Sequence, residues 1–331
     1  MTHRVWIRFV FLSMILSLLP GALRAQTNLA AALAKLTPAE RAEVKGIVDI
    51  HAHGGPDYIP RRYDFLDYAK AAKAAGFRGA IMKSHEVPTA QTAYFVRKLV
   101  PGFAAFGTLV MNRSVGGINP RALEIQAQIQ GHYLKFVYMP TQDAETPAKH
   151  EKNIPFVPVS KNGVLLPEVI EVMKLIQKYD LVFATGHVQP PDALLLVHKA
   201  QEMGLKRVSV THPALEGTTI PQMVEEASTG AFLEITCNQI IPTNQDGTDK
   251  ILPNPPAHQP QEYIDIIKGV GAEHLILSGD FGRPDYISFL PGWPMAIAAL
   301  KKLGVTQAQI DIMAKKNPAH LLGLDDAPPA K

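Results

Sequence analysis

Residues 47–57, with the sequence IVDIHAHGGPD, run from an apolar segment into two histidines and a glycine-rich turn. Side chains two residues apart on a β-strand point to the same face, roughly 6.6 Å apart along the chain. His51 and His53 would therefore converge on one point. Convergent imidazoles before a Gly-Gly-Pro turn are typical of a metal site at the carboxyl-terminal end of a strand. The stretch by itself fits equally well one surface histidine and one hydrogen-bonded histidine.

Seven further apolar runs follow, and longer amphipathic segments separate them. Together with the first run, the predicted strands cover residues 47–51, 79–84, 104–110, 133–138, 181–186, 207–211, 231–236 and 275–279. Apolar residues at three- and four-residue spacing predict helices between them. Alternating strands and helices imply parallel strands, and eight repeats over about 250 residues predict an α/β fold of the (β/α)8 barrel type. A doubly wound open sheet is the alternative.

The composition allows a large core and argues against a nucleic-acid partner. Of 331 residues, 47% are hydrophobic and 19% are charged, which suits one large α/β domain or two ordinary ones. The net charge is only +3, and no block of Lys and Arg suggests a nucleic-acid-binding surface. The single cysteine, Cys237, permits no internal disulfide, and the apolar sequence around it predicts a buried thiol.

The first residues are typical of a secretory signal peptide. Arg4 and Arg8 precede the apolar stretch FVFLSMILSLLP, and small residues follow it, so cleavage is predicted after Ala25. A membrane span needs about 20 apolar residues, so we expect a secreted, periplasmic protein with no integral membrane segment after cleavage. An uncleaved anchor is the alternative. The expected segments are a signal peptide at 1–25, a lead-in at 26–45, with a helix capped by Thr37, the barrel at 46–324 and a disordered tail at 325–331.

Chemically capable side chains gather at the ends of the predicted strands. On a barrel they would face one mouth, beneath two long connections at 139–166 and 237–260. Five histidines and an aspartate at such positions are an improbable coincidence, and they predict metal binding. In strand order the candidates are His51 and His53, Lys83 and His85, Asn112 and Arg113, Lys135 inside the fourth strand, His187, His212 and Asp280.

The order of these residues resembles the amidohydrolase superfamily of metal-dependent hydrolases. His-x-His on strand one, Lys on strand four, His on strands five and six, and Asp on strand eight are matched by His51, His53, Lys135, His187, His212 and Asp280. The motifs HAHGGPD, MKSHEVPT, NRSVGGINP, YMPT, ATGHV and VTHP together look like an uncharacterised group within it, a domain-of-unknown-function family. The resemblance covers nearly all of the mature chain, including NPAHLLGL, which looks like a closing helix.

The resemblance implies one or two divalent metal ions per chain, with Zn²⁺ expected from the imidazole ligands. His51 and His53 would hold one ion, and His187 and His212 a second. Lys135 would bridge them after carboxylation by CO₂. A lysine paired with a carboxylate inside the barrel is the alternative for Lys135, and Lys83 is its rival as the bridge.

The resemblance gives Asp280 two roles, as a metal ligand and as the catalytic group that takes a proton from the attacking water. A helix N-cap is the alternative. Asp49, two residues before His51, could orient a ligand histidine, or could be an ordinary strand-end aspartate. Further candidates for an extra ligand or a substrate contact are Lys83, His85, Asn112, Arg113 and Arg61. One arginine could clamp a substrate carboxylate, although solvated loop charge is the alternative for each.

The function implied is a metal-dependent hydrolase that cleaves a C–N or C–O bond in an amide, cyclic amide or lactone. The expected partner is a small-molecule substrate, and a homo-oligomer is compatible with the resemblance. Two alternatives on the same barrel are a phosphoester hydrolase and a mononuclear-metal decarboxylase. A secreted barrel that binds metal or ligand without turnover is a third, and the presence of Asp280 argues against it.

Overall fold

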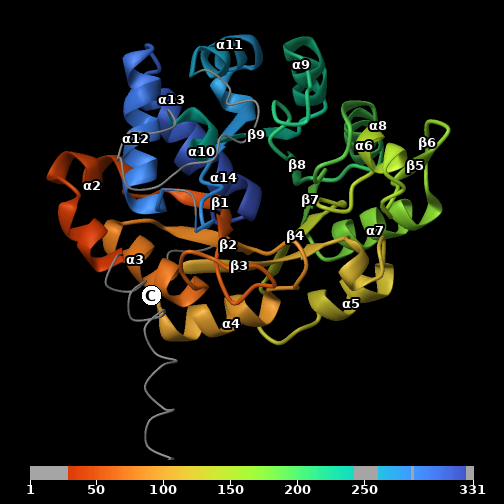
Figure 1. Cartoon of the computed structure of the whole chain (residues 1–331), viewed down its shortest axis with the longest axis horizontal. Coiled ribbons are helices and arrows are strands. Elements are labelled where there is room, and N and C mark those ends of the chain that lie inside the picture. Colours follow the sequence, from red (N-terminus) through yellow and green to blue (C-terminus); the bar gives the residue numbers. More distant parts are fainter. Residues whose placement is uncertain (1–28, 242–259, 285–286, 326–331) are drawn as a thin grey trace, which may run out of the picture.

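The computed structural model describes residues 29–241, 260–284 and 287–325. Eight parallel strands form a nearly closed barrel with helices outside it (Figure 1). Each strand overlaps one predicted apolar run, so the predicted (β/α)8 barrel is confirmed. In order around the barrel the strands are β1 (Val48–His53), β2 (Gly79–Lys83), β3 (Ala104–Val110), β4 (Leu134–Tyr138), β7 (Val182–Ala184), β8 (Val208–Val210), β9 (Phe232–Thr236) and β10 (Leu275–Ser278).

The outer helices carry ordinary start and stop signals. Helix α3 (Phe65–Ala75) begins after Asp64, whose side chain accepts a hydrogen bond from the backbone N–H of Asp67 at 2.7 Å, and it ends at Gly76 in the left-handed conformation. The predicted cap at Thr37 is confirmed as a capping box. Further helices are α2 (Pro38–Val44), α4 (Ala90–Leu99), α5 (Pro120–Ala127), α7 (Pro167–Lys178), α8 (Pro190–Glu202), α9 (Ile220–Ser228), α11 (Pro260–Val270) and α12 (Phe289–Lys302).

Apolar side chains fill two layers of the fold. One layer lies between the strands and the outer helices, and it is the larger core. The other includes Ile50, Phe136 and Tyr138 of the strands, and it packs against Leu321 of the closing helix α14 (Asn317–Leu322). Cys237 is buried as a free thiol, as predicted. Among the described residues, no helix combines the length and the apolar character that a membrane span requires.

The first and last strands meet without a regular ladder. Instead, the backbone N–H of Asp280 donates to His51 O at 2.7 Å, and the N–H of His53 donates to Phe281 O at 3.0 Å. The carboxylate of Asp49 accepts a further hydrogen bond from the N–H of Gly279 at 2.9 Å. The seam of the barrel therefore lies where β1 and the residues after β10 bring their polar side chains together.

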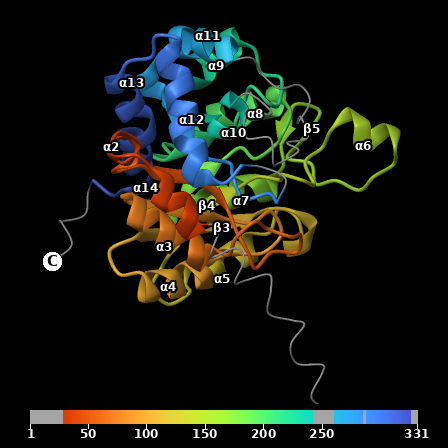
Figure 2. The same ribbon diagram turned by 60° about the vertical axis from the view of Figure 1, so that its left-hand side comes forward.

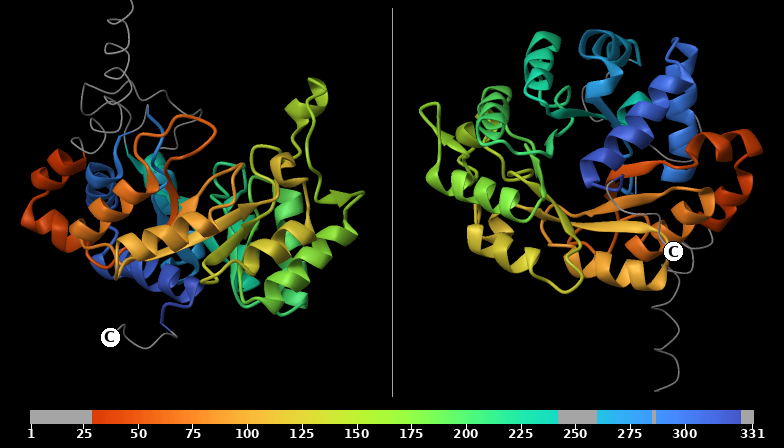
Figure 3. Two further views of the ribbon diagram at one scale, coloured as in Figure 1. Left: turned by 90° about the horizontal axis from the view of Figure 1, so that it is seen from below. Right: turned by 180° about the vertical axis from the view of Figure 1, so that it is seen from behind.

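The long connection after β4 carries small elements of its own. It holds α6 (Pro147–Glu151) and the hairpin of β5 (Ser160–Lys161) and β6 (Val164–Leu165). This part projects beyond the barrel in Figures 2 and 3. The second long connection begins with α10 (Cys237–Ile240), and its residues 242–259 lie outside the described residues. The predicted signal peptide lies outside them too, as does the predicted tail except for residue 325.

Candidate metal centre

Five imidazoles form a closed ring at the mouth of the barrel. The distances between successive ring centroids are 5.0 Å from His51 to His53, 5.0 Å from His53 to His85 and 5.5 Å from His85 to His187. The ring closes with 4.8 Å from His187 to His212 and 5.6 Å from His212 to His51. The structure thus brings together all five histidines that the sequence places at strand ends.

Asp280 joins the first two histidines in one three-residue group. Its Oδ1 atom lies 3.2 Å from Nε2 of His51 and 3.3 Å from Nε2 of His53. The Nδ1 atoms have other partners, because His51 Nδ1 lies 2.7 Å from Glu234 Oε1 and His53 Nδ1 lies 3.0 Å from the backbone oxygen of Lys83. These partners orient both Nε2 atoms towards the carboxylate, as partners of metal-ligating histidines do.

A second three-residue group consists of His187, His212 and Glu216, whose ligand atoms lie within 4.8 Å of one another. Nδ1 of His212 lies 3.4 Å from Glu216 Oε1. Nε2 of His187 is buried and has no hydrogen-bond partner among the described residues. Sequence reasoning missed Glu216. The available signal was an acidic residue four positions after His212, in the turn that follows β8.

Burial sets the protonation of these groups. It lowers the pKa of His53 to about 3, that of His212 to about 4 and that of His187 well below the usual range. Burial alone would raise the pKa of Asp280, but the neighbouring His51 and His53 hold it well below its usual range. At neutral pH these three imidazoles are uncharged and Asp280 is ionised, which are the states that bind a divalent metal.

Lys83 is the lysine that reaches this cluster. It is the last residue of β2, it is fully buried, and its Nζ lies 2.7 Å from His51 Nε2. Nζ also lies 4.5 Å from the centroid of the Tyr138 ring. Burial lowers the pKa of Lys83 to about 8, while the charges of Glu234, Asp280 and Glu216 act in the opposite direction.

The prediction that Lys135 bridges two metals needs correction. Lys135 is the second residue of β4, and its Nζ donates to the backbone oxygen of Asp180 at 2.6 Å and to Asp180 Oδ2 at 3.3 Å. Asp180 precedes β7 and also pairs with Arg207, which precedes β8. Lys135 therefore lies at the amino-terminal end of the barrel, opposite the imidazole ring, where it pairs with the exposed Asp180 rather than with a carboxylate inside the barrel.

The prediction that Asp49 orients a ligand imidazole also needs correction. The pairing of β1 with β2 shifts register between Asp49 and Ala52, which marks a β-bulge. The bulge changes the side-chain alternation, so the carboxylate of Asp49 accepts from Tyr68 Oη and from the backbone N–H of His51. Glu234 on β9 holds the His51 ring instead. Its sequence signal was a lone glutamate inside the apolar run AFLEIT.

The remaining candidates divide into buried supports and exposed groups. Nδ1 of His85 lies 2.8 Å from Thr141 Oγ1, and Asn112 Nδ2 donates to both Thr141 Oγ1 and His85 O at 2.9 Å. Asn112 thus supports His85 from behind. The side chain of Arg113 is exposed and does not line the central cavity, whereas that of Arg61 does.

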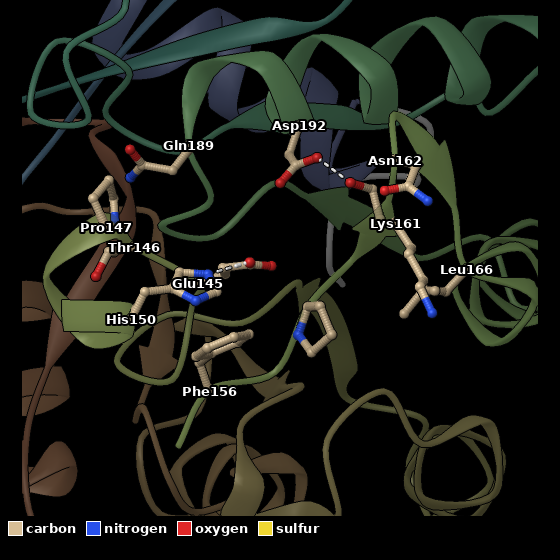
Figure 4. A pocket seen from close by; sticks show the side chains of 12 residues that line it. Glu145, Thr146, Pro147, His150, Phe156, Lys161, Asn162, Leu166, Gln189 and Asp192 are labelled. Carbon is tan, nitrogen blue, oxygen red and sulfur yellow. Dashed lines mark hydrogen bonds and ion pairs between the residues drawn. The ribbon is translucent and has the colours of Figure 1, made fainter. Parts of the chain in front are cut away.

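The imidazole ring opens into a cavity of about 660 Å³. Beside the metal-ligating candidates its wall includes Arg61, Gln142, Glu216 and Arg283. A second hollow of about 690 Å³ lies under the connection after β4 (Figure 4). Its polar groups pair with each other, as Ser160 does with Asp192 at 2.6 Å, and one histidine lines it. The donor set for a metal therefore belongs to the central cavity.

The (β/α)8 barrel fold is shared with solved structures of several enzymes. The structure is similar to 2,6-dihydroxybenzoate decarboxylase from Rhizobium, with a TM-score of 0.55, 15% identity and coverage of 85% of this chain and 99% of the other. It is also similar to a putative 2-pyrone-4,6-dicarboxylic acid hydrolase from Pseudomonas putida, with a TM-score of 0.52, 15% identity and 85% and 98% coverage. A third similar structure is that of an amidohydrolase from Pseudomonas aeruginosa, with a TM-score of 0.54 and 13% identity. The similarity covers 87% of this chain and 100% of the other.

The particular family follows from the sequence. Residues 46–234 match the model of DUF6282, a family of unknown function, and the chain belongs to that family. A search of curated proteins found no significant match. The uncharacterised group predicted from the motifs is therefore confirmed.

Proposed function

We propose that the protein is a metal-dependent hydrolase that cleaves a C–N or C–O bond in a small amide, cyclic amide or lactone. The observation that carries the proposal is the closed ring of five imidazoles with Asp280 and Glu216 in one cavity. Structural neighbours named as a pyrone dicarboxylic acid hydrolase and an amidohydrolase support the reaction class through their fold.

The residues present fit divalent cations. His51, His53 and Asp280 would hold one ion, and His187, His212 and Glu216 would hold another. The mixture of neutral imidazoles and carboxylates favours Zn²⁺. A bound cation would polarise a carbonyl oxygen and lower the pKa of a coordinated water.

Asp280 is suited to move the proton. Its carboxylate is ionised, and Asn238 Nδ2 donates to Oδ2 at 3.0 Å, which fixes the rotation of the group. Oδ1 faces the two imidazoles of the first group. We assign to Asp280 the uptake of a proton from the attacking water and its transfer to the leaving nitrogen or oxygen.

We assign to Lys83 the bridging role first predicted for Lys135. Its buried Nζ contacts His51 and is affected by the charges of Asp280 and Glu216, one from each group. The lowered pKa favours the neutral amine, which can add to CO₂. The N–C bond of a carbamate then forms and a proton leaves Nζ to solvent, so that the lysine gains an anionic oxygen ligand.

Metal analysis followed by an activity panel tests the function. The purified protein is stripped, reloaded with Zn²⁺ or Mn²⁺, and assayed with lactones, amides, cyclic imides, phosphotriesters and 2,6-dihydroxybenzoate. We expect two metal ions per chain and metal-dependent hydrolysis of a carbonyl substrate. Release of CO₂ from 2,6-dihydroxybenzoate by protein with one metal ion per chain would contradict the hydrolase proposal and favour a decarboxylase. Cleavage of phosphotriesters alone would favour a phosphoester hydrolase. Bound metal without turnover of any substrate would contradict the proposal that the protein is an enzyme.

We also propose that the chain is exported with loss of residues 1–25. The support is the Arg-flanked apolar stretch and the small residues after it. Amino-terminal sequencing of protein recovered after secretion should begin near Gln26. Full-length chain in a membrane fraction would contradict this proposal.

A further inference from the structure

One wall of the central cavity carries a buried arginine. Arg61 belongs to the connection between β1 and α3, and its side chain is only 3% exposed although it lines the cavity. Nε and Nη2 both lie 2.7 Å from Asp57 Oδ2. A buried guanidinium that reaches a cavity is costly unless its donors are used.

Asp57 holds this guanidinium in a fixed place. Asp57 Oδ1 accepts from Ser84 Oγ at 2.9 Å and from the backbone N–H of Tyr58 at 2.8 Å. Ser84 stands between Lys83, the last residue of β2, and His85, which lines the cavity. Arg61 is thus tied to the same strand end as the imidazole ring, and its position relative to the ring is set by the scaffold.

The pairing leaves part of the guanidinium for a ligand. Asp57 pairs with Nε and with the buried Nη2, whereas Nη1 has no polar partner among the described residues. Nη1 therefore keeps its N–H donors for a ligand carboxylate, while Nε and Nη2 hold Asp57. Arg61 and the imidazoles of His51 and His53 line the same cavity.

We propose that Arg61 binds a carboxylate of the substrate, so that the enzyme acts on small carboxylic acids that carry the scissile amide or lactone. This inference rests on the proposed function, because it names the substrate class of the same cavity. The carboxylate would accept hydrogen bonds from Nη1 of Arg61 while the reacting carbonyl faces His51, His53 and Asp280. Arg283 lines the same cavity and adds a second positive charge to it.

A binding experiment tests this without requiring turnover. Benzoate and its neutral counterpart benzamide are titrated into wild-type protein, Arg61→Gln and the control Arg113→Gln by ligand-observed NMR. Both EDTA-treated and Zn²⁺-loaded samples are used, because binding through a metal would disappear with EDTA and binding through Arg61 would remain. We expect benzoate to bind EDTA-treated wild type and Arg113→Gln, and to bind Arg61→Gln about 10–100-fold more weakly. Benzamide should not distinguish the three proteins.

Arg61→Lys covers the case in which Arg61→Gln folds poorly. Lysine keeps the positive charge beside Asp57 but lacks the planar fork, so benzoate affinity should still fall about tenfold while the melting temperature stays near wild type. Equal benzoate affinity in wild type and both Arg61 variants, or no benzoate binding to EDTA-treated wild type, would overturn the inference. Failure of the hydrolase proposal would instead show as absent turnover with this binding pattern intact.

Discussion

Lys83 and Lys135 stand on strands of the same barrel but at opposite ends of it. Lys83 is the last residue of β2 and contacts His51, whereas Lys135 is the second residue of β4 and contacts Asp180. Both lysines lie in apolar strands. Their positions along the strand differ, and this difference makes Lys83 a candidate metal bridge and Lys135 a member of a structural ion pair. In a parallel barrel, the distance of a residue from the carboxyl end of its strand therefore matters more than which strand carries it.

The largest effect is expected at the end of the barrel that holds Lys83. Asp280→Asn keeps the shape and a weak oxygen ligand but removes the proton acceptor. Turnover should drop by ~10²–10⁴-fold, while the metal content, measured by mass spectrometry, falls modestly. Near-normal turnover would exclude Asp280 as the base. It would also argue against catalysis at the end of the barrel that holds Lys83.

Lys83→Ala removes the proposed bridge. Metal content should fall first, and activity should fall with it by about 10²-fold or more. Acetate or propionate should restore part of the activity, because a short carboxylate can occupy the space left by the side chain. Lys83→Met is the matched control, since its side chain fills that space and should prevent the rescue. A Lys83→Ala enzyme with its full metal complement would remove Lys83 from the bridging role.

Glu226 on α9 shows what burial does without a metal-ligating neighbour. Both carboxylate oxygens are buried without hydrogen-bond partners among the described residues, and burial, with a smaller effect of Glu225, raises the pKa to about 7. Because this exceeds the usual value of 4.5, the folded state binds the proton more tightly. Stability should therefore decline as the pH rises from about 4.5 to 7.

Glu226→Gln should remove that decline. At pH 8 we expect it to raise the free energy of unfolding by about 1–3 kcal/mol, and at pH 4 to leave it nearly unchanged. Urea unfolding at the two pH values measures both. Glu171→Gln, at an exposed position on α7, serves as the control. An equal effect of Glu226→Gln at both pH values would show that packing, rather than ionisation, governs this site.

Lys135→Ala should have the smallest effect. It removes the partly exposed ion pair with Asp180, which contributes about 0.5–1 kcal/mol to stability. Metal content and turnover should stay at wild-type levels, and urea unfolding should record the loss. Loss of metal in this variant would restore the original prediction for Lys135 and would reverse the comparison with Lys83.

The strands and the five histidines were predictable from sequence because both depend on local pattern. Apolar runs at regular spacing locate the eight barrel strands, and the histidines stand directly at or after the ends of those runs. The roles of Lys135 and Asp49 were not predictable in the same way. Lys135 fits the family order, but its depth in β4 decides its contacts, and the bulge in β1 turns Asp49 away from the imidazoles.

The acidic residues of the site show the same limit. Glu234 and Glu216 approach His51 and His212 through the packing of β9 and the folding of a turn. Single-sequence reasoning has no rule that brings Glu234 to a histidine 183 residues away. A charged residue in an apolar strand, such as Glu234 in AFLEIT, was nevertheless a usable signal, because an unpaired buried carboxylate is costly.

The seam between β1 and β10 has a consequence for how the centre comes into being. Asp49 and Gly279, which join there, are 230 residues apart, and the same seam divides the first metal group between His51 and His53 on one side and Asp280 on the other. A growing chain that lacks β10 offers two histidines but neither their carboxylate nor the strand that closes the barrel. The first metal group is therefore complete only when β10 and the residues after it have joined β1.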